Sequence, residues 1–414
     1  MFYPTGVHFL CFLCTKTKTM RNFLFLAAAV PLLLYSCSKN NSLSGLGHRT
    51  QPKDPVPVAD TSVYVSAVIV PDDYDWHRDT ACGAASCSLI LIRDGTPCLS
   101  IPTGAAAEVS TDPDTHHLIG GHLYTEYSTV SETVIRRDGE ELVRYGGREV
   151  LVGLLVDSTG VYTLGRNRDS DGFCFRRNGE SLLRQDSGLV FGDFCKSSYG
   201  RTGALYRDGG AVCFCYRNSI SCYVVRNGIS SPVNLDFSPS RVMDLHFYDS
   251  NAYSIADMQF MIVAKGPGGR MNLLTGSSAY RDLEIYRGED CVWWHGSNSD
   301  SGGSTVCTEL LSNRKLTFAG DNNFLYHDGE SVFAVGSGHG MLMVQDGSSG
   351  IIFGRDSTYL FSRDCAVSCG GELYVLVNPK EHDETPYLWK DGEERFFMLN
   401  GFLTSVEVVV SPSS

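Results

Sequence analysis

Short apolar runs separated by turn residues recur along this chain from about residue 61 to residue 410. The clearest instance is residues 148–185, whose four runs are Val150–Val156, Val161–Arg166, Phe173–Arg177 and Ser181–Arg184. The turn Asn178-Gly179 between alternating runs favours a tight type I′ hairpin, because both residues tolerate positive φ. The pattern therefore predicts four antiparallel strands in about 40 residues, which is the size of one propeller blade.

Two features repeat with this unit, whose strands are named A (innermost) to D (outermost). An aromatic residue recurs in strand B at Tyr64, Tyr124, Tyr162, Phe214, Tyr253, Trp293, Phe333 and Tyr374. Strand C often ends in a basic or polar residue followed by Asp-Gly or Asn-Gly, at residues 93–95, 137–139, 177–179, 226–228, 345–347 and 390–392. The units after the first are expected at 114–145, 148–185, 202–235, 240–275, 280–318, 322–355 and 361–399.

The first unit lacks an innermost strand, and the end of the chain has a strand without a hairpin partner. Strand B of this unit starts at Thr61 and is preceded only by a Pro-rich segment, whereas Leu403–Val410 is a β-branched run with nothing after it to pair with. If the last run completes the first unit, the ring closes and no sheet edge between the first and last blades is left open. The predicted fold is all-β, a single β-propeller over residues 61–414 with eight four-stranded blades; seven blades is the alternative.

The N-terminal residues have the pattern of a targeting segment. Met20-Arg21-Asn22 opens a positive region, and the apolar stretch Phe23–Leu34 has the length of a signal-peptide core but is too short to span a bilayer. We therefore expect residues 1–36 to be a signal peptide, with Met20 as the expected start. Residues 37–60 are rich in Ser, Asn, Gly and Pro, which predicts a flexible tether.

Two motifs resemble known proteins. Leu34-Tyr35-Ser36-Cys37 resembles the lipobox of bacterial lipoproteins, which implies lipidation of Cys37. Ser38, and not Asp, follows the cysteine, which resembles the signal for outer-membrane sorting and implies an outer-membrane location. Tyr374 together with Trp389-Lys390-Asp391-Gly392 is similar to the repeats of Bacteroidetes-type propeller lipoproteins. The resemblance covers residues 61–410 and implies the architecture but no particular activity. Whether the protein faces the periplasm or the cell surface stays open.

Charge and composition limit the classes of partner that are expected for this protein. The formal net charge is −13, and no basic run carries interleaved aromatics, so nucleic acid is not an expected partner. We expect a monomer that meets the membrane only through its lipid. No G-x-S-x-G, H-E-x-x-H or phosphate-binding glycine loop is present in the sequence.

Cysteines and histidines give little sign of a metal centre. Of the 15 cysteines, Cys82 and Cys87 share one loop and are a candidate disulfide, while Cys174, Cys213 and Cys215 are expected in the core. Cys365 and Cys369 lack the second ligand pair that zinc requires. His116, His117 and His122 are interpreted as surface histidines, and no metal site is assigned.

The two longest B–C loops, which are rich in aromatic and charged residues, belong to units one and eight. Ring closure makes these two units neighbours. Their candidate ligand-binding residues are Asp72, Asp73, Tyr74, Asp75, Trp76, Arg78, Glu381, His382, Asp383 and Glu384. The aromatic rings suit stacking on a sugar, and the carboxylates suit hydroxyl groups or, as an alternative, Ca²⁺; otherwise no cofactor is expected. Ordinary solvated acidic loops are the competing interpretation.

Three functions remain compatible with this pattern. The leading hypothesis is a non-enzymatic, lipid-anchored cell-envelope module that binds a protein or a glycan at the B–C loop face. A glycan-active hydrolase or lyase is the second, since Asp75, Asp79 and Glu381 offer carboxylates, although no motif fixes them as a catalytic pair. A structural subunit of an envelope assembly is the third. The sequence does not decide whether the protein is catalytic and favours the binding module.

Overall fold

The computed structural model describes residues 60–71, 87–147, 149–167, 170, 172–187, 189–194, 204–218, 221–234, 241–248, 251–257, 261–265, 271–276, 280–287, 292–298, 304–309, 314–328, 331–338, 341–347, 350–356, 358–359, 363–380 and 384–411. All of them lie in one compact unit, Pro57–Ser414. Within these ranges, no helix has the length and apolar character needed to cross a membrane.

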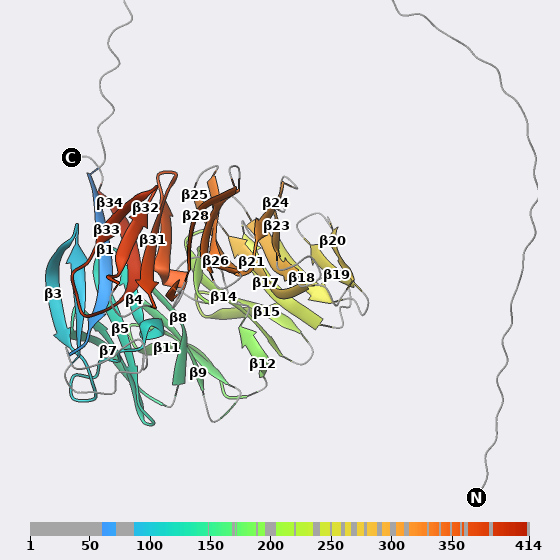
Figure 1. The fold of residues 1–414 in the computed structure, drawn as a ribbon. Coiled ribbons are helices and arrows are strands. Elements are labelled where there is room, and N and C mark those ends of the chain that lie inside the picture. Colours follow the sequence, from blue (N-terminus) through green and yellow to red (C-terminus); the bar gives the residue numbers. More distant parts are fainter. Residues whose placement is uncertain are drawn as a thin grey trace, which may run out of the picture. The chain divides into compact units, whose positions relative to one another are not determined.

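The described strands form eight antiparallel sheets, so the predicted all-β propeller of eight blades is confirmed (Figure 1). In blades one to four the strands are β1 (Asp60–Ile69), β2 (Ser88–Arg93), β3 (Thr96–Pro102), β4 (His116–Ile119), β5 (His122–Ser128), β6 (Glu132–Arg137), β7 (Glu140–Gly146), β8 (Glu149–Asp157), β9 (Gly160–Asn167), β10 (Phe173–Arg177), β11 (Glu180–Gln185), β12 (Leu189–Phe194), β13 (Tyr206–Asp208), β14 (Ala211–Asn218), β15 (Cys222–Arg226) and β16 (Ile229–Val233). A short 3-10 turn, η1 (Pro113–Thr115), precedes β4.

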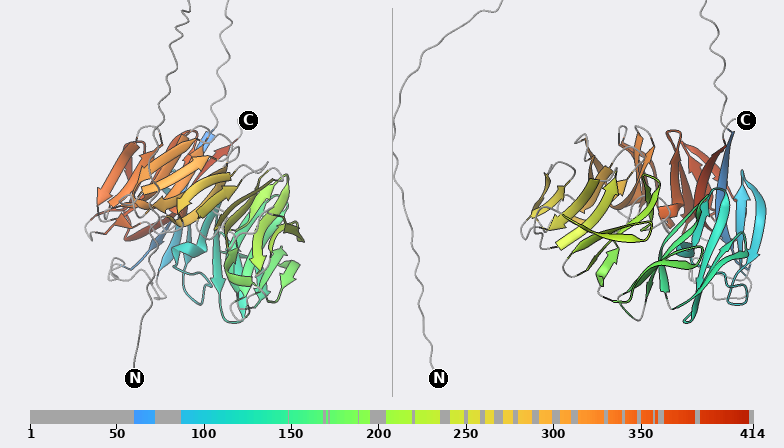
Figure 2. Two further views of the ribbon diagram at one scale, coloured as in Figure 1. Left: turned by 90° about the vertical axis from the view of Figure 1, so that its right-hand side faces the viewer. Right: turned by 180° about the vertical axis from the view of Figure 1, so that it is seen from behind.

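The second half of the chain continues the same plan (Figure 2). Its strands are β17 (Arg241–Tyr248), β18 (Asn251–Asp257), β19 (Met261–Lys265), β20 (Met271–Gly276), β21 (Tyr280–Arg287), β22 (Val292–Asn298), β23 (Ser304–Glu309), β24 (Lys315–Ala319), β25 (Asp321–Asp328), β26 (Ser331–Gly338), β27 (Met341–Asp346), β28 (Gly350–Asp356), β29 (Thr358–Tyr359), β30 (Ala366–Cys369), β31 (Glu372–Pro379), β32 (Tyr387–Lys390), β33 (Glu393–Phe396) and β34 (Gly401–Ser411). A second 3-10 turn, η5 (Arg363–Cys365), precedes β30.

The C-terminal strand β34 closes the ring as predicted. It pairs antiparallel with β1 from Asp60↔Ser411 to Ile69↔Gly401, and the sheet order of blade one is β3-β2-β1-β34. Figure 1 shows the blue strand β1 beside the red strand β34. Because β34 also contacts β30 and β31 of blade eight and β4 of blade two, it links three consecutive blades.

The core lies between neighbouring blades. One buried cluster joins Tyr162 and Phe175 of blade three to Phe214 and Tyr216 of blade four. Another joins blade one to blade eight and includes Leu403 and Val406 of β34. The sheets in these two clusters therefore depend on a neighbouring blade to bury their apolar side chains.

The recurring Asp/Asn-Gly pairs are explained by the turn between strands C and D. Both turn residues have positive φ in five of the six instances, for example φ 51° at Asn178 and 82° at Gly179. The Asn178 Oδ1 atom accepts a hydrogen bond from the Val161 amide at 2.9 Å, and the Asp94 Oδ1 atom does the same for the Val63 amide at 2.8 Å. An Asp or Asn therefore provides both the turn geometry and an acceptor that ties the turn to the start of strand B.

The recurring aromatic and basic residues meet across strands B and C. Tyr64 is opposite Arg93 in the ladder, and Tyr374 is opposite Lys390. The Arg93 guanidinium carbon lies 5.7 Å from the Tyr64 ring centroid, and the Lys390 ammonium lies 5.0 Å from that of Tyr374. These cation–π pairs give the repeated residues a structural role in joining strands B and C.

Two unit boundaries differ from the predicted ones because the innermost strand is interrupted. In blade four, β12 and β13 both pair with β14, so the blade begins at Leu189 and not at residue 202. In blade eight, β29 and β30 both pair with β31, and the 3-10 turn η5 lies between them. The two-residue strand β29 is too short to show an alternating pattern, and β12 is separated from β13 by the segment between Phe194 and Tyr206.

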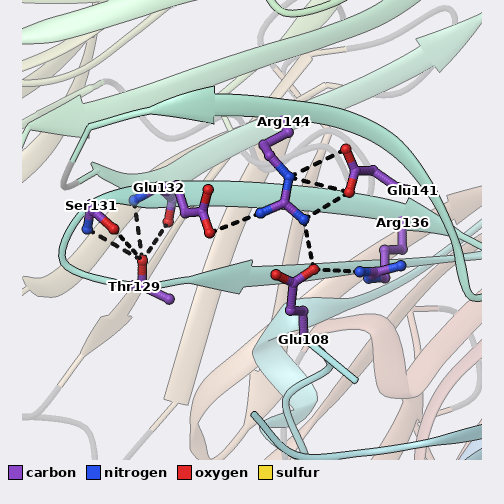
Figure 3. A network of polar contacts seen from close by, with 7 residues as sticks. All are labelled: Glu108, Thr129, Ser131, Glu132, Arg136, Glu141 and Arg144. Carbon is purple, nitrogen blue, oxygen red and sulfur yellow. Dashed lines mark hydrogen bonds and ion pairs between the residues drawn. The ribbon is translucent and has the colours of Figure 1, made fainter. Parts of the chain in front are cut away.

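The connection from blade one to blade two is held by ion pairs (Figure 3). Arg144 of β7 lies 2.7 Å from a Glu108 carboxylate oxygen, 2.8 Å from Glu132 and 2.7 Å from Glu141. Arg136 also pairs with Glu108, and the two guanidinium groups hold the pKa of the Glu108 carboxyl below its usual value. Because Glu108 lies in the connection between blades one and two, these pairs fix that connection against blade two.

Candidate functional site

On the face that carries the D–A and B–C loops, hydrogen bonds join the connections of blades eight and one. The Asn400 carbonyl oxygen, just before β34, accepts a hydrogen bond from the Val70 amide at 2.9 Å. The Asn400 side-chain amide donates to the carbonyl oxygens of Val70 at 3.4 Å and Pro71 at 2.9 Å. The chain that enters the blade-one B–C loop is therefore held directly by the connection that leaves blade eight.

A buried polar clamp lies beneath this junction. Asn378 of β31 is fully buried, and its side chain both accepts from the Leu403 amide at 2.8 Å and donates to the Leu403 carbonyl at 3.0 Å. The Ser66 hydroxyl lies 2.6 Å from those of Thr404 and Ser405, where the register of β1 and β34 shifts. These bonds satisfy the bulged backbone and fix where the strands of blades eight and one end.

Most of the predicted ligand-binding residues lie outside the described residues, so their positions stay predictions. These are Asp72, Asp73, Tyr74, Asp75, Trp76, Arg78, Glu381, His382 and Asp383. The strands that flank them are described, and closure makes blades one and eight neighbours, with the ends Ile69 and Pro379 on the same face.

Glu384 is the one predicted ligand-binding residue that the structure describes. Its carboxylate lies 2.8 Å from the Arg355 guanidinium, which projects from β28 of blade seven. Arg355 also covers the buried Tyr387 ring at 5.5 Å from its centroid, and burial raises the pKa of Tyr387 to about 12. Glu384 therefore ties the end of the blade-eight loop to blade seven, with both charged groups still partly exposed.

Two exposed apolar side chains on this face were not singled out in the sequence. Phe396, the last residue of β33, is 54% exposed, and Met398 in the blade-eight D–A connection is 90% exposed. The Phe397 amide bonds the Pro386 carbonyl at 2.9 Å, which places this segment beside the end of the blade-eight B–C loop. An exposed Met and Phe beside an Arg–Glu pair is a surface typical of binding sites.

A group of titratable side chains gathers where the innermost strands of blades two and eight begin. The His117 Nδ1 atom of β4 lies 3.7 Å from an Asp364 carboxylate oxygen of η5. Burial, followed by the charges of Asp112 and Asp364, raises the pKa of Asp114 in η1. No sequence signal predicts this meeting, because the two segments are far apart in the chain and are brought close by ring closure.

The interpretation of all three histidines as surface residues is wrong for His116. His116 is fully buried, its Nε2 atom bonds the Ser110 carbonyl at 2.7 Å, and burial lowers its pKa to about 4. His117 is partly buried, whereas His122 is exposed and bonds Asp138 at 2.6 Å. The alternation of β4 explains the difference, because His116 faces the protein interior.

Cysteine positions agree with the core prediction. Cys174, Cys213 and Cys215 are buried and carry free thiols. Cys87 is disulfide-bonded, and its partner lies outside the described residues, as does the predicted partner Cys82. Within the part of the chain that the structure describes, no group of three His, Cys, Asp or Glu side chains is suited to hold a metal ion.

Comparisons with known proteins identify no family for this chain. No protein-family model matches the chain, and no curated protein matches it. Among solved structures, AztD from Citrobacter koseri aligns with 86% of this chain and 100% of its own at 9% identity and a TM-score of 0.49. The dihydro-heme d1 dehydrogenase NirN, in complex with DHE, aligns with 83% and 74% at 11% identity and a TM-score of 0.48.

A structure of a nidogen/laminin complex aligns with 57% of this chain and 93% of its own chain, at 13% identity and a TM-score of 0.33.

Proposed function

We propose that this protein is a lipid-anchored cell-envelope propeller that binds a protein or glycan partner through the loop face at blades eight, one and two. The observation that carries the proposal is the closure by β34, which makes blades one and eight neighbours and joins the connections Val70–Pro71 and Asn400 by hydrogen bonds. The B–C loops of units one and eight then start from adjacent blades on one face.

The chemistry of this face suits recognition. Arg355 and Glu384 offer charges of both signs, and Met398 offers an exposed apolar group. Tyr74 and Trp76 supply rings that stack on sugars or fill a pocket on a protein partner. Such a mixed surface supports a binding role without requiring a catalytic group.

A glycan-active enzyme is a second candidate, favoured by one observation. Asp114 neighbours Asp112 and Asp364 on the same face, and burial together with these charges raises its pKa, which is the direction that a general acid requires. Release of new reducing ends from a bound glycan, lost in Asp114→Asn, would favour this candidate over a simple binding module.

The proposal is tested with a soluble Cys37→Ser chain in a glycan array and a pull-down from envelope extract. For the partner so identified, we expect Trp76→Ala to weaken binding at least tenfold, roughly the loss of one stacking anchor, with little change in melting temperature.

Ile229→Ala is the matched control, because Ile229 is an apolar side chain that is 72% exposed and follows a C–D turn in blade four. Equal binding by the wild type and Trp76→Ala would show that Trp76 is not part of the binding site. A large drop in the melting temperature of Trp76→Ala would show that the ring belongs to the core.

A further inference from the structure

In four C–D turns the glycine contacts an apolar side chain on the outermost strand of the preceding blade, whereas Gly392 of blade eight has open space beside it. The open side of Gly139 faces Ile101 of β3, that of Gly179 faces Val143 of β7, and that of Gly228 faces Leu182 of β11. Gly347 of blade seven faces Leu316 of β24 in the same way. In these four junctions an apolar side chain therefore seals the gap between two blades.

The junction of blades eight and one departs from this rule. Gly95 faces Arg395 of β33, and a Cβ atom on Gly95 would lie only 2.7 Å from the guanidinium. The Arg395 Nη2 atom donates to the Asp94 carbonyl oxygen at 2.6 Å. A charged group with several N–H donors thus occupies the place that an apolar side chain has in those four junctions.

A cleft of about 490 Å³ opens at this junction, on the face that carries the A–B and C–D turns. It is lined by Thr61 and Val63 of β1, Tyr374 of β31, Leu388 and Lys390 of β32, and Glu393, Glu394 and Arg395 of β33. Leu388 is opposite Arg395 in the ladder and Tyr374 is opposite Lys390, so these side chains share the sheet face that looks toward blade one. The volume is in the range of small-molecule sites.

Arg395 is the cation in the cleft that has no carboxylate contact among the described residues. Lys390 is paired, because its ammonium lies 2.7 Å from a Glu372 carboxylate oxygen. Glu393 and Glu394 also line the cleft, but the described contacts join neither of them to Arg395. Among the described residues, the contact found for the Arg395 guanidinium is a neutral carbonyl, which leaves its remaining donors for a carboxylate.

We propose that this cleft binds amphipathic small molecules that carry one carboxylate. The carboxylate bonds the Arg395 guanidinium, and the apolar part lies against Val63, Leu388 and the Tyr374 ring. The proposal is independent of the binding function assigned to the loop face, because the cleft is at the opposite ends of the same strands.

The test compares N-acetyl-phenylalanine with its neutral carboxamide as probes, using calorimetry and ligand-observed NMR on the Cys37→Ser chain. We expect the carboxylate probe to bind and the carboxamide to bind roughly tenfold or more weakly, since a charge-assisted fork is lost. Arg395→Leu should weaken binding of the carboxylate probe to the same extent. We expect no drop in melting temperature, because a leucine also fills the junction of blades three and four and that of blades six and seven.

Arg184→Leu serves as the control, since Arg184 is also on an outermost strand and pairs only with the exposed Asp186 among its described contacts. Arg395→Lys, which keeps the charge but loses the planar fork, should fall between wild type and Arg395→Leu. The proposal is overturned if no carboxylate probe binds at up to about 10 mM. Equal binding of the carboxamide, or unchanged binding by both Arg395 variants, overturns it as well.

Discussion

Deleting residues 402–414 is expected to destroy the cooperative stability of the whole domain. β34 supplies the innermost strand of blade one and contributes Phe402, Leu403 and Val406, each with no exposed surface. Burial of three such side chains is worth about 5–9 kcal/mol, which is comparable to the entire stability of an ordinary domain. The deletion also removes Glu407, whose carboxylate accepts from the Gly120 and Gly121 amides of blade two at 2.9 and 2.8 Å.

Thermal and urea unfolding followed by circular dichroism measure this effect. A truncation of residues 412–414 alone is the control, because the last paired residue of β34 is Ser411. We expect the short truncation to unfold like wild type and the long one to melt more than about 10 °C lower or to lack a cooperative transition. A long truncation with the wild-type melting temperature would contradict the closure.

Replacing Cys37 by Ser is expected to release the protein from the membrane almost completely. If Cys37 is the lipidated residue, the single change removes every acyl chain, and each buried CH₂ contributes about 0.8 kcal/mol to anchoring. Membrane fractionation with labelling by a palmitate analogue measures the effect. Cys98→Ser is the control, since Cys98 is an exposed free thiol. Continued lipid labelling of Cys37→Ser would show that the anchor is elsewhere.

Ring closure was predictable from the sequence because it follows from counting strands. The first unit lacks an innermost strand and the last strand lacks a partner, so the simplest prediction is that the two pair. The structure shows this pairing between β1 and β34. The C–D turns were predictable for a local reason, since Asp-Gly and Asn-Gly carry their geometry in two residues. The cation–π contacts of Tyr64 and Tyr374 explain why the same turns carry a basic residue.

The candidate site was less accessible to sequence reasoning because it is made of long-range contacts. Asn378 is an ordinary polar residue in sequence, and its role as a clamp depends on Leu403 of another blade. His117 and Asp364 meet only after the ring has closed. Arg395 becomes unusual only when it is compared with other blade junctions, because its neighbour Gly95 is 300 positions away in the chain.

Site-specific photo-crosslinking to the partner identified in the pull-down tests the binding face most directly. A photoreactive residue at Met398, which is 90% exposed on the loop face, is compared with one at Ile229, which is 72% exposed beside a C–D turn. We predict a crosslink from position 398 that unlabelled partner suppresses, and none from position 229. Crosslinking from position 229 with none from position 398 would contradict a partner site on the loop face.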